Sequence, residues 1–397
     1  MIRPAKVPTG SLKKDARKYL TLQRQKAGTS SSCFFFQVLF INIMKHLTLL
    51  GLVFTVLAAC TQNPANNKEA LTNSAQFIDT TEMTNNFYDN TETYSLPVKE
   101  LTVEGEVSNP GSVDLSSLPR RSVIVKETLL DDTGSDRFVG AYRYDGCSLF
   151  DILEKRIPVK VNSEEFNPII DLFVEVENDK GEKVVFSWGE IYYPNNLHRI
   201  IIADAVARIV PSKTNDLWPL PVESKIVAGN DLITERNISS PVRITVRSYP
   251  RSFNVVKGLT PMYSGKIYLY YNGSPAGFLS DFPSGMEPLT YNTIFYGRGR
   301  GIHSTQPFTG LLLRDVLAAS YPVSHENLKA GMMCISAEDG YRCTLSYSEL
   351  FNRNDQQEFL LVRTAAGEDG GFLRIFPAAD FFSDRAIKSV REIHLGY

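Results

Sequence analysis

The sequence lacks the residue patterns that usually indicate metal or thiol chemistry. Five cysteines occur in 397 residues, and they form neither a Cys-x-x-Cys pair nor a Cys/His cluster at zinc spacing. There is also no Gly-x-Ser-x-Gly motif, and the scattered histidines have no motif context that would support a Ser/His/Asp arrangement. The residues alone therefore predict no metal site and leave the catalytic residues, if any, unknown.

An excess of positive charge is also missing. The chain has 42 Lys and Arg against 44 Asp and Glu. Nine of the basic residues but one acidic residue lie before residue 60, so the remainder is clearly acidic. Proteins that bind nucleic acid broadly need positive charge to displace counterions, and attraction to anionic lipid needs it too. The charge therefore predicts no nucleic-acid partner, and membrane attachment would need another device.

The segment from Met44 to Cys60 offers another means of membrane attachment. A short cationic start at Lys45 precedes an apolar run, two small residues and a cysteine, which is the layout of a secretory signal peptide. The ending Leu-Ala-Ala-Cys resembles the signal of bacterial lipoproteins. This resemblance implies that residues 44–59 are removed, that Cys60 carries a diacylglycerol, and that the protein is lipid-anchored in the cell envelope, on the outer membrane or the periplasmic face.

A transmembrane helix is the alternative for this region, because residues 34–59 are largely apolar. A span needs about 20 apolar residues, and the two polar residues Lys45 and His46 in its middle would be unfavourable. Residues 1–43 are basic and show no core pattern. We interpret them as a mis-assigned translation start, with synthesis beginning at Met44.

The rest of the chain divides into a tether and two domains. Residues 60–95 are rich in Asn, Thr, Gln and Glu, a composition that cannot bury much surface and predicts a disordered tether. Strand-like segments separated by turn signals follow, at 101–107, 122–126, 172–176, 183–188 and 242–247. One helix is expected at 148–155. Short strands with few helices favour an α+β fold, with domains at 96–250 and 262–397.

An internal repeat supports two domains. Residues 144–153 and 308–317 share the pattern aromatic-x-Gly-x-x-Leu-x-Asp-aliphatic-Leu. About thirty residues later, each copy has an expected hairpin followed by Ser-x-x-Glu, at Ser187–Glu190 and Ser346–Glu349. Each copy then has a strand with an arginine, Arg243 in the first and Arg374 in the second.

Several of these motifs, in this order, resemble the molybdopterin-binding domain of the sulfite oxidase family. They are a Gly-x-Val-x-x-Pro turn at 105–110, the two helix starts, a Ser-to-Tyr hairpin at 336–341, the segment 371–377 and the strand at 386–393. The resemblance implies two tandem sulfite-oxidase-like domains with mixed β-sheets. It also implies molybdopterin as a cofactor and an oxidoreductase as the ancestral activity.

The cysteine that ligates molybdenum in that family is missing from both copies. Residues 126–131 contain none, and Tyr296 stands near the ligand position of the second copy. Cys147 falls at an apolar position and is expected to be a small buried residue. Because a molybdenum site needs this soft thiolate, the sequence favours a ligand-binding or interaction module over its alternative, a molybdopterin-dependent oxidoreductase. A structural envelope component that binds only other proteins is a third hypothesis.

The segment Gly297–His303 is the most suggestive local feature. Its alternating glycines let backbone N–H groups approach an anion, and Arg298 and Arg300 supply forked donors. We predict that Arg298, Arg300 and His303 bind an anionic small molecule or a pterin, although a solvated loop has the same composition. By resemblance, Arg374 and Lys388 belong to the same site. The alternative is that Arg374 pairs with a carboxylate and Lys388 is solvated.

Three smaller predictions concern side chains outside that segment. Cys334 and Cys343 flank a hairpin and are candidates for a disulfide, which an exported protein permits. Asp231, Glu235 and Arg236 lie in a polar connection and are expected to face water. The two tryptophans, at 188 and 218, are expected to pack in the core.

Overall fold

The computed structural model describes residues 86–355, 358–364 and 372–396. They belong to one compact unit, which runs from Ile78 to Tyr397. The residues interpreted as a mis-assigned start, the predicted signal peptide, Cys60 and the predicted tether as far as residue 85 lie outside the described residues. Within the described ranges, no helix has both the length and the apolar character that a membrane span requires.

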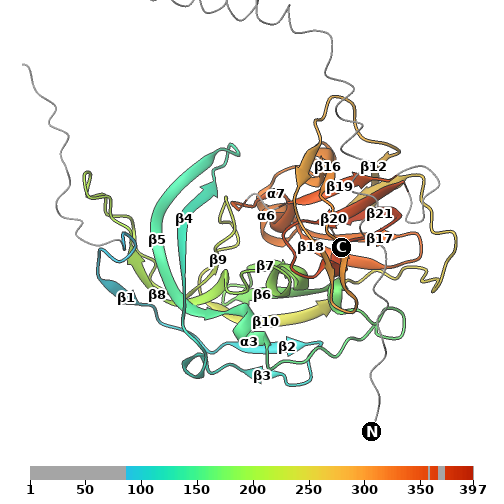
Figure 1. The fold of residues 1–397 in the computed structure, drawn as a ribbon. Coiled ribbons are helices and arrows are strands. Elements are labelled where there is room, and N and C mark those ends of the chain that lie inside the picture. The colour runs from blue at the N-terminus through green and yellow to red at the C-terminus, as the bar shows by residue number, and fades with distance from the viewer. Residues whose placement is uncertain (1–85, 356–357, 365–371, 397) are drawn as a thin grey trace, which may run out of the picture. The chain divides into compact units, whose positions relative to one another are not determined.

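The fold is dominated by β-sheet, and the expected fold class is wrong. Of the described residues, 42% lie in strands and 12% in helices, and four sheets are arranged as a four-bladed β-propeller rather than as two tandem sulfite-oxidase-like domains of the α+β class (Figure 1). The α-helices of the described residues are short, with five or six residues each. The expected helix, for example, is α3 (Leu149–Leu153), which is too short to form a layer of its own.

The first half of the described chain builds two sheets. One has the order β3-β2-β10-β6-β7, and the other has the order β1-β8-β5-β4 with β9 beside β8. All five strands predicted from the sequence are present in these sheets. Their bounds are β1 Thr93–Ser95, β2 Thr102–Gly105, β3 Gly111–Ser112, β4 Arg121–Leu130, β5 Asp136–Ser148, β6 Leu172–Asn178, β7 Lys183–Ser187, β8 Ile200–Arg208, β9 Lys225–Ala228 and β10 Pro241–Ser248.

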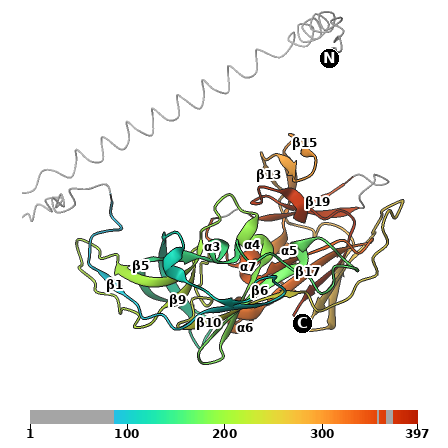
Figure 2. The same cartoon turned by 90° about the horizontal axis from the view of Figure 1, so that it is seen from below.

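The second half builds two more sheets, with orders β12-β11-β21-β17-β18 and β13-β16-β19-β20, and a two-stranded ribbon, β14-β15. In Figure 2 the strands β13 and β15 lie near each other at one border of the unit. The bounds are β11 Ile267–Tyr271, β12 Ser274–Leu279, β13 Leu289–Tyr291, β14 Phe295–Gly297, β15 Gly301–Ser304, β16 Phe308–Leu312, β17 Met332–Ala337, β18 Arg342–Ser346, β19 Phe359–Arg363, β20 Leu373–Pro377 and β21 Val390–Leu395.

The two halves repeat one topology. In the first, β10 pairs in parallel with β2 and antiparallel with β6, and in the second, β21 pairs in parallel with β11 and antiparallel with β17. A strand–helix step recurs as β5–α3 and as β16–α5 (Leu313–Leu317). The matching closing strands are therefore β10 and β21. Arg374 lies on β20 and is not the counterpart of Arg243.

Each Ser-x-x-Glu motif starts a helix at the end of a hairpin. Ser187 caps α4 (Trp188–Tyr192) by accepting the Glu190 backbone N–H, and the Glu190 side chain completes a capping box. Ser346 caps α7 (Tyr347–Phe351) in the same way through the Glu349 N–H. In the part of the chain that the structure describes, the remaining helices are α6 (His325–Ala330) and three 3-10 turns, η1 Leu115–Ser117, η2 Ile169–Asp171 and η3 Ser383–Arg385. The connection expected between the two domains, residues 251–261, lies between β10 and β11.

The candidate disulfide is not formed. Cys334 and Cys343 are free, because the β17–β18 register places Cys334 opposite Thr344 and Cys343 opposite Ile335. A one-residue offset directs the two thiols to opposite faces of the sheet, and they belong to different apolar clusters. Cys147 is fully buried, as expected.

Candidate functional site

Two neighbouring cavities share the side chain of Arg298. One, of about 290 Å³, has aromatic walls, and the other, of about 400 Å³, is more polar. We call the two together the aromatic cleft. Its walls come from both halves of the chain, and the side chains that matter below are Ile157, Trp188, Tyr192, Tyr193, Arg298 and Phe382 in the first cavity and Arg298, Tyr341 and Asp384 in the second.

Trp188 lines this cleft and carries a buried, unpaired donor. It is the first residue of α4, it is 2% exposed, and its indole stacks on Tyr192 with ring centroids 4.5 Å apart. Its Nε1–H is buried and has no hydrogen-bond partner among the described residues. Leaving such a group unpaired is costly, and most buried polar groups in native proteins are paired. Because this N–H is closed to solvent, Trp188 contributes the apolar part of its ring to the wall.

The second copy of the repeat provides a comparison. Tyr347, at the position equivalent to Trp188, stacks on Phe351 with centroids 4.4 Å apart. Its hydroxyl donates to the backbone oxygen of Tyr321 at 3.3 Å, and the ring is buried in the main apolar cluster. The same stacked pair thus closes the core in one half and borders a cavity in the other.

Arg298 lies in the turn between β14 and β15. Its side chain is 53% exposed, and its Nε lies 3.0 Å from Oδ2 of Asp384. The Tyr193 hydroxyl donates to the same Asp384 oxygen at 3.3 Å, and the Tyr341 hydroxyl donates to the Asp384 backbone oxygen at 2.8 Å. Burial raises the pKa of both phenols well above 10, so they remain donors at any physiological pH.

Asp384 is placed by a buried cluster of charges directly behind the cleft. Its neighbour Arg385 is 0% exposed and forms paired bonds of 2.8 and 2.7 Å with Asp380. Arg385 also lies 2.6 Å from Glu349, and 3.4 Å from the Ser187 hydroxyl of the other half. These contacts hold Arg385 and Asp380 together in the connection between β20 and β21. Asp384, next to Arg385, is thereby placed beside Arg298.

The first half contains the same arrangement around Arg236. Its guanidinium bonds Asp231 at 2.8 and 2.7 Å, Glu190 at 3.0 Å and Ser346 at 3.1 Å. The expectation that Asp231, Glu235 and Arg236 face water is wrong, since they are 4%, 5% and 1% exposed. The sequence signal was a second repeat, Asp-x-x-Thr-Glu-Arg at 231–236 and Asp-x-x-Ser-Asp-Arg at 380–385, which was not recognised.

The other predicted anion-binding residues do not join Arg298. Arg300 is exposed in the same turn, and Lys388 is exposed before β21. His303 is exposed and stacks on Phe295 with centroids 4.9 Å apart. Arg374 lies over the ring of Phe308, 5.5 Å from its centroid. Arg298 is thus the predicted residue that the structure places in the cleft.

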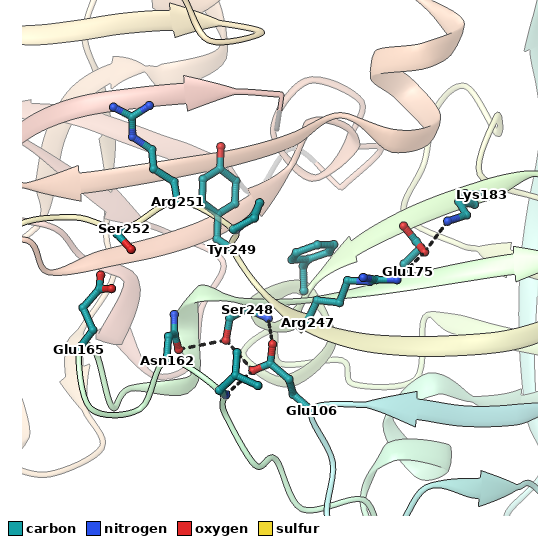
Figure 3. Close-up of a pocket in the computed structure, with 13 residues that line it drawn as sticks. Glu106, Asn162, Glu165, Glu175, Lys183, Arg247, Ser248, Tyr249, Arg251 and Ser252 are labelled. Carbon is teal, nitrogen blue, oxygen red and sulfur yellow. Dashed lines mark hydrogen bonds and ion pairs between the residues drawn. The ribbon is translucent and has the colours of Figure 1, made fainter.

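A larger cavity of about 510 Å³ lies at the ends of β6 and β10 (Figure 3). Its carboxylates are already engaged: Glu106 accepts two bonds of 2.6 Å from Ser248, and Glu175 pairs with Lys183 at 2.9 Å. Figure 3 shows Arg247 directed toward Glu175 and Arg251 directed away from it. The charged groups therefore do not converge on one point, and we do not assign a ligand to this cavity.

A serine, a histidine and an aspartate do meet near α3, but not as a catalytic triad. Ser148 Oγ lies 3.1 Å from His198 Nδ1, and Asp151 Oδ2 lies 3.5 Å from the same nitrogen. A triad needs the two partners on opposite ring nitrogens. Ser148 is buried and caps α3, so these residues start a helix. In the described ranges, no group of three or more His, Cys, Asp or Glu is placed to hold a metal ion.

Comparison with known proteins adds no assignment. No protein-family model matches this chain, and no curated protein matches its sequence. The arguments for function therefore rest on the aromatic cleft and on the amino-acid sequence.

Proposed function

We propose that this chain is a binding protein of the cell envelope that takes an anionic ligand with a flat apolar body in the aromatic cleft. The observation that carries the proposal is an aromatic wall, built on the stacked rings of Trp188 and Tyr192, that Arg298 borders. Ligand sites are typically apolar cavities with a few convergent polar groups, and this cleft has that composition.

The charge of the ligand follows from the donors. Arg298 offers forked N–H groups that suit carboxylate, sulfonate or phosphate, whereas the Tyr193 and Tyr341 hydroxyls already donate to Asp384. An anion in the cleft would compete with Asp384 for Arg298. The stacked Trp188–Tyr192 pair and Phe382 present flat faces, which favours a planar body.

A binding role fits these groups better than an oxidoreductase role. The hypothesis of a molybdopterin enzyme depended on the tandem fold that the structure contradicts, so we do not retain it. What the cleft offers is donors and aromatic faces, which position a ligand.

Attachment to a membrane through a lipid on Cys60 remains a proposal from the sequence. If it is correct, intact mass of the native protein will show a chain that starts at Cys60 and carries acyl groups. The Cys60→Ser variant will then remain in the aqueous phase when membranes are separated. An unmodified native chain would contradict this part of the proposal.

Calorimetric titration with naphthalene-2-sulfonate tests the binding role, with naphthalene-2-sulfonamide as the neutral probe. We expect the sulfonate to bind more tightly than the sulfonamide. Arg298→Gln should weaken sulfonate binding by about tenfold or more, the effect of losing one charge-assisted bond, and Trp188→Phe should weaken it severalfold. Arg300→Gln and Trp218→Phe are the matched controls and should bind as the unchanged protein does. Equal affinity in all five proteins would contradict the proposal.

A further inference from the structure

An extended segment beside the aromatic cleft leaves an apolar row open to solvent. Ile157, Val159 and Val161 alternate along the chain and are 64%, 56% and 81% exposed. Between them, Lys160 turns inward, and its ammonium donates to the backbone oxygens of Phe166 and Pro168 at 2.6 Å each. Alternation of this kind places the three aliphatic side chains on one face. We call residues 157–161 the exposed edge.

The backbone of the exposed edge is paired on one side. The Ser108 N–H donates to the Ile157 oxygen at 2.8 Å, and the Val159 N–H donates to the Glu106 oxygen at 2.9 Å. The backbone groups of residues 158 and 160 therefore point to the other side. Among the described residues, neither the Pro158 oxygen nor the Lys160 N–H has a hydrogen-bond partner. A free edge with an apolar face is a template for another extended chain.

The charges around the exposed edge identify that chain. Lys155 precedes it and Glu164 follows it in a turn, and both are exposed, whereas Arg156 donates to the Asn109 and Ser112 oxygens and Glu165 pairs with Arg342. In an antiparallel pair of two identical segments, the basic end of each lies beside the acidic end of the other, whereas a parallel pair would bring like charges together. The segment is thus complementary to itself in one direction, as a twofold interface requires.

We propose that two copies of this chain associate through their exposed edges, antiparallel and centred on Val159. This register brings the Lys160 N–H of each copy to the Pro158 oxygen of the other, which uses the unpaired backbone groups on both sides. Each Ile157 then packs against Val161 of the second copy, and the two Val159 side chains meet at the axis. Directly opposite aliphatic pairs are the usual unit of sheet stabilisation.

The contact is short, so the association is weak. Five residues a side fall below the roughly 800 Å² per partner of a stable interface, and Pro158 has no N–H to extend the ladder. We expect a dissociation constant of about 10 to 100 µM, typical of a transient pair. Ile157 also borders the aromatic cleft, but the argument for the dimer uses no ligand, so failure of one proposal would leave the other standing.

Sedimentation velocity of the full chain over a concentration series in the micromolar range tests the inference. We expect a reversible monomer–dimer equilibrium. Val159→Asp should abolish it, whereas Val222→Asp, at a valine that is 80% exposed elsewhere, should leave it unchanged. Circular dichroism of both variants checks that they remain folded.

A charge exchange makes the test specific to the antiparallel arrangement. Lys155→Glu should weaken dimerisation about fivefold to tenfold, since it changes two symmetry-related exposed pairs from attraction to repulsion. Adding Glu164→Lys to that variant should restore the affinity to within about threefold of the original. A chain that stays monomeric throughout the series, a dimer that persists in Val159→Asp, or a double variant no better than the single one would overturn the proposal.

Discussion

Arg236 donates a hydrogen bond of 3.1 Å to the hydroxyl of Ser346, a residue 110 positions later in the chain. Arg385 makes the reciprocal contact, because its guanidinium lies 3.4 Å from the hydroxyl of Ser187. Each arginine thus connects the acidic residues of its own half to the helix cap of the other half. Two buried arginines hold the two copies of the repeat together, and one of them also stands behind the aromatic cleft.

Removing either arginine should destabilise the whole unit. Arg385→Met leaves Asp380 and Glu349 buried without their cation, and breaking a buried pair from one side costs about 3–5 kcal/mol. We expect a loss of that size in the free energy of unfolding, measured in urea, and a similar loss for Arg236→Met. Arg247→Met, at a side chain that is 50% exposed, should cost under about 1 kcal/mol. A loss of unfolding free energy below about 1 kcal/mol for Arg385→Met or Arg236→Met would contradict the role given to these arginines.

The same cluster should give the protein an unusual pH dependence. Burial raises the pKa of Asp380 from 3.8 to about 6. Between these values the folded state holds a proton that the unfolded state has lost, so this group's contribution to stability falls as pH rises from about 4 to about 6. Asp380→Asn cannot titrate. The difference in unfolding free energy between the original protein and this variant should therefore change across that window and level off above it. A constant difference would contradict the raised pKa.

Gly189 should not tolerate a methyl group, although its φ angle lies outside the left-handed region that favours glycine. A Cβ at this position would lie 2.2 Å from Nη1 of Arg385, so Gly189→Ala would displace the guanidinium from its partners. We expect a loss of about 1–3 kcal/mol, as for other overpacked sites. Gly299→Ala is the control, because nothing lies within 4 Å of its Cβ position. Equal thermal stability of the two variants would count against the packing described here.

Asp384 should limit the affinity of the cleft for anions. Its carboxylate occupies Arg298 at 3.0 Å, and a bound anion must share or replace it. Asp384→Asn should therefore bind naphthalene-2-sulfonate more tightly, by about twofold to fivefold, the range of a partly exposed ion pair. Asp315→Asn changes an exposed aspartate beside Arg314 outside the cleft and should have no effect. Weaker binding by the Asp384 variant would show that Asp384 helps to hold the ligand instead.

Local features of this fold were predictable, because short-range chemistry determines them. Ser187 and Ser346 each cap a helix through a hydrogen bond that spans three residues; the pattern Ser-x-x-Glu was found at both positions, but only its place after a hairpin was predicted. The strand at 172–176 was predicted because its residues suit a buried strand. The topology of the four sheets was not, since parallel partners such as β2 and β10 are more than a hundred residues apart.

The buried charges show a different reason for failure. Asp231 and Arg236 were expected in solvent because charged residues are rarely buried, yet each has its partner within the same six residues. A comparison of residues 231–236 with 380–385 would have shown that the motif is repeated. Arg298 was selected for its glycine neighbours, and the structure places it in the cleft through Asp384. The unpaired indole of Trp188 could not be predicted, because it depends on contacts between distant segments.

Fluorescence of Trp188 gives the most direct test of the aromatic cleft as a ligand site. The chain has two tryptophans, so the Trp218→Phe variant reports on Trp188 alone and the Trp188→Phe variant on Trp218 alone. With naphthalene-2-sulfonate as the titrant, we expect a saturable change in Trp188 emission. Its midpoint should equal the one found by calorimetry. The change should disappear when Arg298→Gln is added to the Trp218→Phe variant. Trp218 should not respond. A response from Trp218 alone, or none from Trp188 while heat is still released, would place the ligand outside this cleft.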